Sequence, residues 1–151
     1  MRYFKFIAIS FLFSIPTRIN CQDVRDSVDY YINKLDTHSV AVSTGHPRPR
    51  YYFDYASGWL LKQPVDSLNK KMFGLLTDKR KVLAAHVILS KKNLGDYFPH
   101  GETGIYKGDE LIGFTSCYNH FSWTWISPDQ TIIHDVEMKS IQDFWRKLLR
   151  Y

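Results

Sequence analysis

Cysteine is scarce in this chain of 151 residues, and a long hydrophobic run is missing altogether. The two cysteines are Cys21 and Cys117. The longest apolar run, residues 6–15, is interrupted by Ser10 and Ser14 and has only ten residues. A helix that spans a bilayer needs about 20 predominantly apolar residues. We therefore expect no transmembrane span in the mature chain.

The sequence also lacks the spaced motifs of common metal and cofactor sites. It contains no H-E-x-x-H, the usual zinc hydrolase pattern. His100-Gly101-Glu102 matches the H-x-E of zinc deaminases, but the P-C-x-x-C that supplies their remaining ligands is missing. The six histidines show no ligand spacing. We expect neither a metal ion nor a cofactor, and interpret Pro99-His100-Gly101 as a turn with an exposed imidazole.

Residues 1–21 have the layout of a secretory signal peptide. A short start with two cations precedes the ten-residue apolar run, and a short polar exit follows Pro16. Cleavage after Cys21, which is small, predicts export to the periplasm or the medium. The alternative is a lipid anchor on the sulfur of Cys21, although residues 18–20 match the bacterial lipoprotein pattern poorly.

Loss of this leader changes the charge and the cysteine chemistry. Three of the 20 basic residues and none of the 15 acidic ones lie in residues 1–21, which leaves a net charge of +2 for residues 22–151. That balance does not indicate a nucleic-acid partner. Cys117 would then have no partner for an internal disulfide, and a domain of about 130 residues has a core large enough to fold without one.

Residues 22–151 are expected to form a single α+β domain, because they contain no repeat or linker and have the length of one domain. Apolar residues recur every three or four positions over 23–35, which predicts a helix. A loose alternation over 38–44 favours a short strand, and the prolines within 45–50 exclude regular structure there. The aromatic segment 51–61 is compatible with either a strand or a loop.

The middle of the chain predicts a helical hairpin. The first helix starts at Pro64-Val65-Asp66, with Asp66 as the expected cap, and runs to residue 76. The second is predicted over 79–92, with an apolar stripe along one side. His86 lies among apolar residues of this helix, so we expect it to be hydrogen-bonded rather than a metal ligand.

The last third predicts an antiparallel β-meander followed by an amphipathic helix. Residues 101–104 are expected to be a loop, and strands over 105–107 and 111–117 flank a hairpin turn at Gly108-Asp109-Glu110. Residues 119–127 alternate strictly, and residues 131–134 form a further short strand after a turn at 128–129. The helix over 136–150 would lie across the sheet.

Few residues are candidates for catalysis, namely His100, Glu102, Cys117 and His120. A thiolate nucleophile needs a base, usually His, and a third group to orient it, for which Asp135 is available. On one strand, positions 117 and 120 point to opposite faces. Only a turn at residues 118–119 would bring the pair together, and a buried, inert Cys117 is the alternative.

The predicted binding segment consists of Arg48, Arg50, Tyr51, Tyr52 and Tyr55. Arginine and aromatic side chains are favoured at binding surfaces, and the prolines keep the start of this segment at the surface. The alternative is that its rings fill the core. A second aromatic group alternates strictly along one strand and is interpreted as core; it consists of Phe121, Trp123 and Trp125.

Three classes of function are compatible with these features. The first is an exported, non-enzymatic binding or accessory protein of the cell envelope or extracellular space, with a protein or envelope partner. The second is a small secreted hydrolase or nuclease that uses the His, Glu and Cys candidates above. The third is an immunity or inhibitor protein, which needs no catalytic motif. The pattern of residues fixes neither the ligand nor the oligomeric state.

Overall fold

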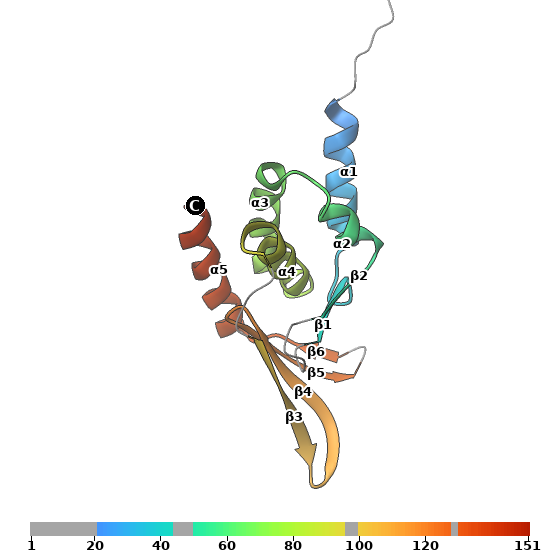
Figure 1. Ribbon diagram of the computed structural model, residues 1–151, viewed down its shortest axis with the longest axis vertical. Coiled ribbons are helices and arrows are strands. Elements are labelled where there is room, and N and C mark those ends of the chain that lie inside the picture. Colours follow the sequence, from blue (N-terminus) through green and yellow to red (C-terminus); the bar gives the residue numbers. More distant parts are fainter. Residues whose placement is uncertain (1–20, 44–49, 96–99, 128–129) are drawn as a thin grey trace, which may run out of the picture.

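The computed structural model describes residues 21–43, 50–95, 100–127 and 130–151. Residues 1–20 of the predicted leader, Arg48, Pro99 and the turn at 128–129 lie outside the described residues. Within the described ranges, helices combine with a two-stranded and a four-stranded antiparallel sheet (Figure 1). The predicted α+β class, with a helical hairpin and an antiparallel meander, is confirmed.

The first part of the fold is a helix followed by the smaller sheet. Helix α1 (Cys21–Lys34) leads into strand β1 (Val40–Ser43), which pairs antiparallel with β2 (Arg50–Phe53). The segment 51–61 divides into β2 and the short helix α2 (Tyr55–Leu60). The strand gives way to the helix at Asp54, whose carboxylate accepts a hydrogen bond of 2.7 Å from the backbone N–H of Ser57 and so caps α2.

The helical hairpin follows, with boundaries that differ from the prediction. Pro64 occupies the N-cap position of helix α3 (Val65–Gly74) without a capping hydrogen bond from its side chain, and Asp66 lies in the first turn of the helix rather than at the cap. The chain then tightens into a 3₁₀ turn, η1 (Leu75–Thr77), before α4 (Val82–Asn93) begins. An acidic side chain in the first turn still complements the helix dipole, which explains why Asp66 gave the signal of a helix start.

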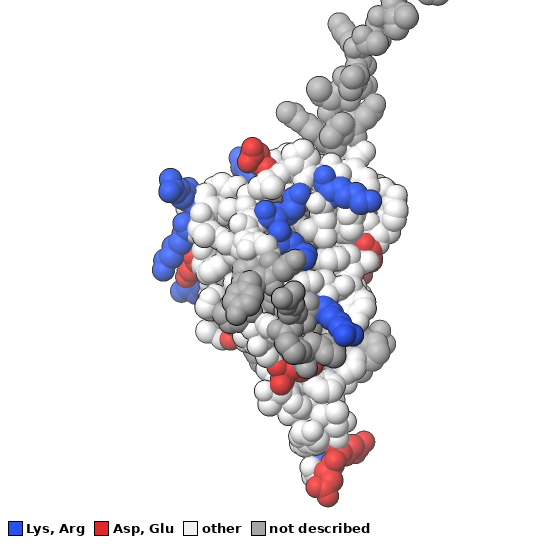
Figure 2. Space-filling view, viewed as in Figure 1, with Lys and Arg blue, Asp and Glu red and all other residues white. Residues whose placement is uncertain are grey.

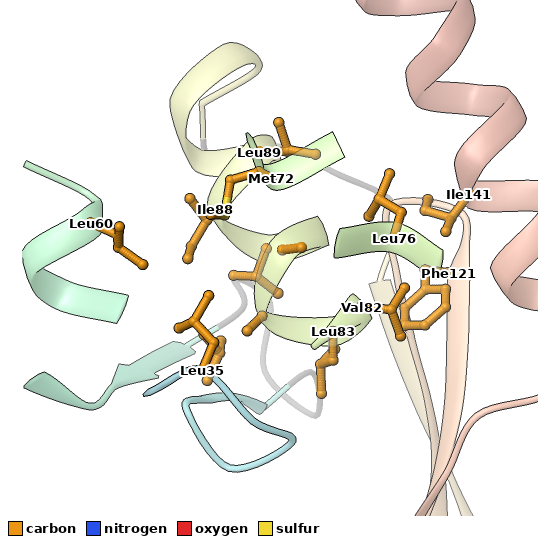
Figure 3. Packing of buried hydrophobic residues seen from close by; sticks show 14 of the residues in the cluster. Leu35, Leu60, Met72, Leu76, Val82, Leu83, Ile88, Leu89, Phe121 and Ile141 are labelled. Carbon is orange, nitrogen blue, oxygen red and sulfur yellow. The ribbon is translucent and has the colours of Figure 1, made fainter. Parts of the chain in front are cut away.

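Helix α4 is the centre of the molecule. Every residue from Val82 to Ser90 is buried, so the predicted apolar stripe is in fact a helix covered on all sides. Figure 3 shows the α4 side chains among residues contributed by α2, α3, η1, β5 and α5. Side chains such as Leu60 and Met72 are fully buried against this cluster, and each such burial stabilises the fold by about 2 kcal/mol.

The larger sheet is a meander in the order β3-β4-β5-β6. Strand β3 (His100–Lys107) pairs with β4 (Glu110–Tyr118), and these two form a long hairpin that extends away from the helices (Figure 1). Strands β5 (Phe121–Ser127) and β6 (Gln130–Ile132) complete the sheet.

Residues 100–104 belong to β3, so the predicted loop at 101–104 and the predicted turn at His100-Gly101 are wrong. Glycine at position 104 reflects crowding rather than a loop. A Cβ atom there would lie 2.9 Å from side-chain atoms of both Leu111 and Tyr106. Such a distance is shorter than a van der Waals contact, so glycine leaves room for these two side chains to pack over the backbone at this position.

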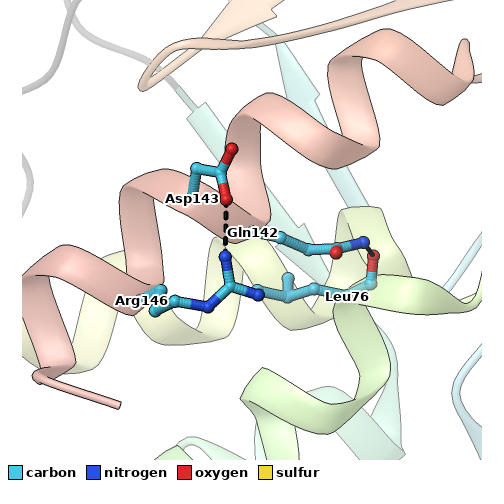
Figure 4. A network of polar contacts seen from close by, with 4 residues as sticks. All are labelled: Leu76, Gln142, Asp143 and Arg146. Atoms are coloured by element: carbon cyan, nitrogen blue, oxygen red, sulfur yellow. Dashed lines mark hydrogen bonds and ion pairs between the residues drawn. The ribbon is translucent and has the colours of Figure 1, made fainter.

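The terminal helix α5 (Asp135–Leu149) is amphipathic, as predicted, and buries Met138, Ile141 and Trp145. Helices α3 and α4 lie between α5 on one side and α1 with α2 on the other (Figure 1). The side-chain amide of Gln142 donates a hydrogen bond of 3.0 Å to the carbonyl of Leu76 and ties α5 to η1 (Figure 4). No helix in the described ranges combines the length and apolar character that crossing a membrane requires.

Candidate functional site

A cleft of about 410 Å³ lies where the two sheets meet. One wall comes from the four-stranded sheet and the other from the smaller sheet and the turn before it, with Leu83 of α4 also contributing. The residues that give the cleft its chemical character are Tyr52, Glu102, Phe114, Ser116, Trp123 and Trp125. Four of these six side chains are aromatic and one is acidic.

The strand register brings these side chains onto one face. Glu102 of β3 pairs with Ser116 of β4, and Ser116 pairs with Trp123 of β5, so the three form one row across the sheet. Phe114 and Trp125 form the next row, with ring centroids 6.1 Å apart. Residues two apart on a strand share a face, which is why the two rows lie side by side.

Glu102 is held by a neighbour from within the sheet. The hydroxyl of Ser116, which is only 3% exposed, donates a hydrogen bond of 3.2 Å to a carboxylate oxygen of Glu102. The Glu102 side chain is itself exposed. Among the described residues it takes part in no ion pair, and no lysine or arginine lines the cleft. The described part of the cleft therefore presents an oriented carboxylate beside aromatic rings and includes no lysine or arginine.

Trp125 lines the cleft and lies at an irregularity of β5. The pairing with β6 shifts register between Trp125 and Ser127. Opposite, a Cβ on Gly113 would lie 2.4 Å from the carbonyl oxygen of Trp125, so only glycine permits this approach. Phe121 and Trp123 are buried, as predicted for a core stripe, but Trp125 at the end of that stripe remains 37% exposed.

The predicted binding segment divides between two faces of β2. Tyr52 is 59% exposed and lines the cleft. Arg50, two residues earlier on the same strand, is also exposed and lies on the same face of β2. Tyr51 points the other way, where its hydroxyl donates a 2.8 Å hydrogen bond to that of Tyr118 and its ring lies under the Lys91 ammonium. Tyr55 begins α2 and is exposed, beside the ring of Tyr31.

The catalytic candidates are distributed over both faces of the larger sheet. His100 and Glu102 lie two apart on β3, so the H-x-E pattern places both on one face. Cys117 is half-buried and, one residue from Ser116, faces the opposite side. His120 lies in the β4–β5 turn with its ring against Phe144.

The structure assembles no triad from these candidates among the residues it describes. No hydrogen bond joins Cys117 to His120 within the described ranges, and Asp135 pairs with Lys79 at 2.8 Å. The same part of the chain holds no group of three His, Cys, Asp or Glu residues in a metal-binding arrangement. The arrangement with the clearest chemical character is therefore the cleft and not a nucleophile with its base.

His86 is a fully buried titratable group of the core, and its expected hydrogen bonding is confirmed. The indole N–H of Trp145 donates to its Nδ1 at 2.9 Å, and its Nε2 lies 3.1 Å from the carbonyl of Tyr118. Nδ1 is thus the acceptor, so Nε2 carries the proton. Burial lowers the pKa of His86 to about 3, against the opposing effect of the Tyr118 carbonyl. The imidazole links α4, α5 and β4 as a neutral structural group.

Sequence reasoning missed the cleft because its parts gave separate signals. The sequence pattern makes Glu102 a catalytic candidate beside His100 and places Trp125 in the core. Phe114 and Ser116 gave no signal of their own. Strand alternation predicts which residues of each strand share a face. The register of the strands is needed in addition to show that positions 102, 114, 116, 123 and 125 all lie on the same face of the sheet.

Comparison with known proteins gives no relative for this chain. No protein-family model, no curated protein and no solved structure matches it.

Proposed function

We propose that this chain is an exported, non-enzymatic binding protein that takes a small ligand, or one side chain of a larger partner, in the cleft between its two sheets. Export is supported by the charged and apolar layout of residues 1–21. The binding role is supported by the cleft and the aromatic side chains that line it.

The observation that carries this proposal is the aromatic lining of the cleft. Its volume of about 410 Å³ falls within the range typical of small-molecule sites, about 300 to 1,000 Å³. Such sites combine apolar and aromatic walls with few polar groups that fix orientation. Trp125 and Tyr52 remain partly exposed here although burial would stabilise them. Exposed aromatic rings on facing walls are available to a ligand rather than to the core.

Ligand binding can be tested through the indole N–H signals of the four tryptophans in ¹⁵N-labelled protein. The titrants are small amines, neutral sugars and short peptides, added one class at a time. A ligand in the cleft should move the signals of Trp123 and Trp125. It should leave the signal of Trp145 unchanged, because that indole N–H is hydrogen-bonded to His86 in the core.

Tyr52→Ala supplies the variant for this experiment, because it removes one aromatic ring from the wall of the cleft and leaves both tryptophans in place. Tyr55→Ala is the matched control, since Tyr55 is exposed outside the cleft. If a titrant moves the Trp123 and Trp125 signals equally in the Tyr52→Ala and Tyr55→Ala variants, the ligand binds outside the cleft. If no class of titrant moves the Trp123 and Trp125 signals, the proposed binding role is wrong.

A further inference from the structure

The carboxylate of Glu102 distinguishes this cleft from a purely apolar one. It stands in the same row as the buried Ser116 and Trp123, and the Ser116 hydroxyl fixes its orientation. Within the described residues no Lys or Arg lines the cleft, and the other titratable side chains in its wall are those of His38 and Tyr52. Among the described lining residues, Glu102 therefore supplies the one carboxylate, which is available to pair with a cationic ligand.

The aromatic rings beside Glu102 also favour a positively charged ligand. Aromatic faces carry a partial negative charge and attract cations, most strongly at tryptophan. Trp123, Trp125, Phe114 and Tyr52 supply four rings around one carboxylate. Recognition of alkylated ammonium groups uses this combination, because the rings contact the apolar substituents while the charge is attracted by ring and carboxylate together.

We infer that the cleft between the two sheets binds an aliphatic ammonium group, whose charge pairs with Glu102 and whose methylene or methyl groups contact Trp125, Phe114 and Tyr52. This inference rests on the proposed binding function and names the chemical class of its ligand. Anions are disfavoured by Glu102. A neutral sugar could use the rings, but it would leave the carboxylate without a counter-charge.

Choline and its neutral carbon isostere test the charge requirement directly, because they have the same shape and differ in one formal charge. Binding to the full exported chain is measured by tryptophan fluorescence and by calorimetry. Choline should bind at least about tenfold more tightly than the isostere, which corresponds to one hydrogen bond or ion pair with a charged group. Butylammonium and a short lysine-containing peptide, added in separate arms, distinguish a free amine from a side chain of a peptide.

Glu102→Gln is the decisive variant, since it keeps the hydrogen-bonding shape and removes the charge. It should raise the Kd for choline about tenfold and leave the Kd for the isostere unchanged. Glu110→Gln is the matched control, because it removes an identical charge from the adjacent strand, outside the cleft. Figure 2 shows acidic side chains at the far end of the long hairpin, where such a change leaves the cleft untouched.

A measurement on the unaltered protein makes the test independent of how the variants fold. Raising sodium chloride from about 20 mM to about 500 mM screens an exposed carboxylate, so choline binding should weaken while isostere binding does not. Equal affinity for choline and isostere, or an unaffected Glu102→Gln variant, would overturn the ammonium inference while cleft binding survives. Failure of amines, sugars and peptides alike to move the cleft tryptophans would overturn the proposed function as well.

Discussion

His86 shows how one residue couples several elements of this protein. Its imidazole accepts a hydrogen bond from Trp145 of α5 and donates to the Tyr118 carbonyl of β4, and it is completely buried. Protonation at Nδ1 would replace an acceptor by a donor that faces the Trp145 N–H. The group is therefore stable only when neutral, and this makes the free energy of unfolding depend on pH.

The direction of this pH dependence follows from the lowered pKa. An unfolded histidine takes up a proton below about pH 6.5, whereas folded His86 stays neutral down to a pKa of about 3. The contribution to stability is therefore complete above pH 6.5 and is lost as the pH falls towards 3, by about 1.4 kcal/mol per pH unit. Urea unfolding between pH 7.5 and pH 5 measures this slope.

His86→Gln should flatten that slope by about 1.4 kcal/mol per pH unit, while lowering stability at pH 7.5 because a buried hydrogen bond is lost. His134→Gln, which removes an exposed imidazole next to α5, should keep the slope of the unaltered protein. An unchanged slope in His86→Gln would show that the buried imidazole is not the group responsible.

At the scale of elements, the two-residue turn between β4 and β5 sets the geometry of the cleft-bearing strands. Asn119 and His120 both have positive φ, at 47° and 66°, which is the type I′ geometry that matches strand twist. Asn119 is also buried, and its amide donates a 2.9 Å hydrogen bond to the Ser90 hydroxyl of α4. One side chain thus fixes both the turn and its contact with the central helix.

We predict that Asn119→Ala and Asn119→Gly separate these two effects in urea unfolding. Both lose the hydrogen bond to Ser90, and each should lower the free energy of unfolding by about 1 to 3 kcal/mol. Alanine should be about 1 kcal/mol worse than glycine, because it also carries a Cβ atom in left-handed backbone. Equal stability of the two variants would mean that the turn relaxes out of its type I′ geometry.

At the scale of the whole molecule, the central helix joins two sheets whose meeting line forms the cleft. Residues from α1 through α5 and from both sheets contribute to a single buried cluster. Cleavage of the predicted leader after Cys21 would remove one residue of α1, which begins there, and leave every other described element intact.

We predict that the exported chain starts at Cys21 or Gln22, as intact mass spectrometry of the secreted or periplasmic fraction would show. The reason is the two-cation start followed by a ten-residue apolar run in residues 1–15. A mass increased by acyl chains on Cys21 would support the lipid anchor instead. Recovery of the full-length chain from the membrane fraction would contradict cleavage.

The sequence alone determined the elements whose signals are local. Periodic apolar residues located α1, α3, α4 and α5, and turn residues located the β3–β4 hairpin, because helix and turn preferences act over a few neighbouring residues. The observed helix boundaries differ by a few positions from the predicted ones, as where α2 begins after Asp54 and α3 begins after Pro64. The hydrogen-bonded role of His86 also followed from its apolar neighbours in sequence.

Tertiary structure decided what depends on strand register and on the packing of distant segments. Glycines 101 and 104 suggest a loop when taken locally, but they lie in a paired strand, and a Cβ at position 104 would come within 2.9 Å of neighbouring side chains. The row Glu102–Ser116–Trp123 joins positions 14 and 7 residues apart in the chain, and Tyr52 faces it from another sheet. No local preference encodes such a juxtaposition, because it arises only when the core forms and the two sheets meet.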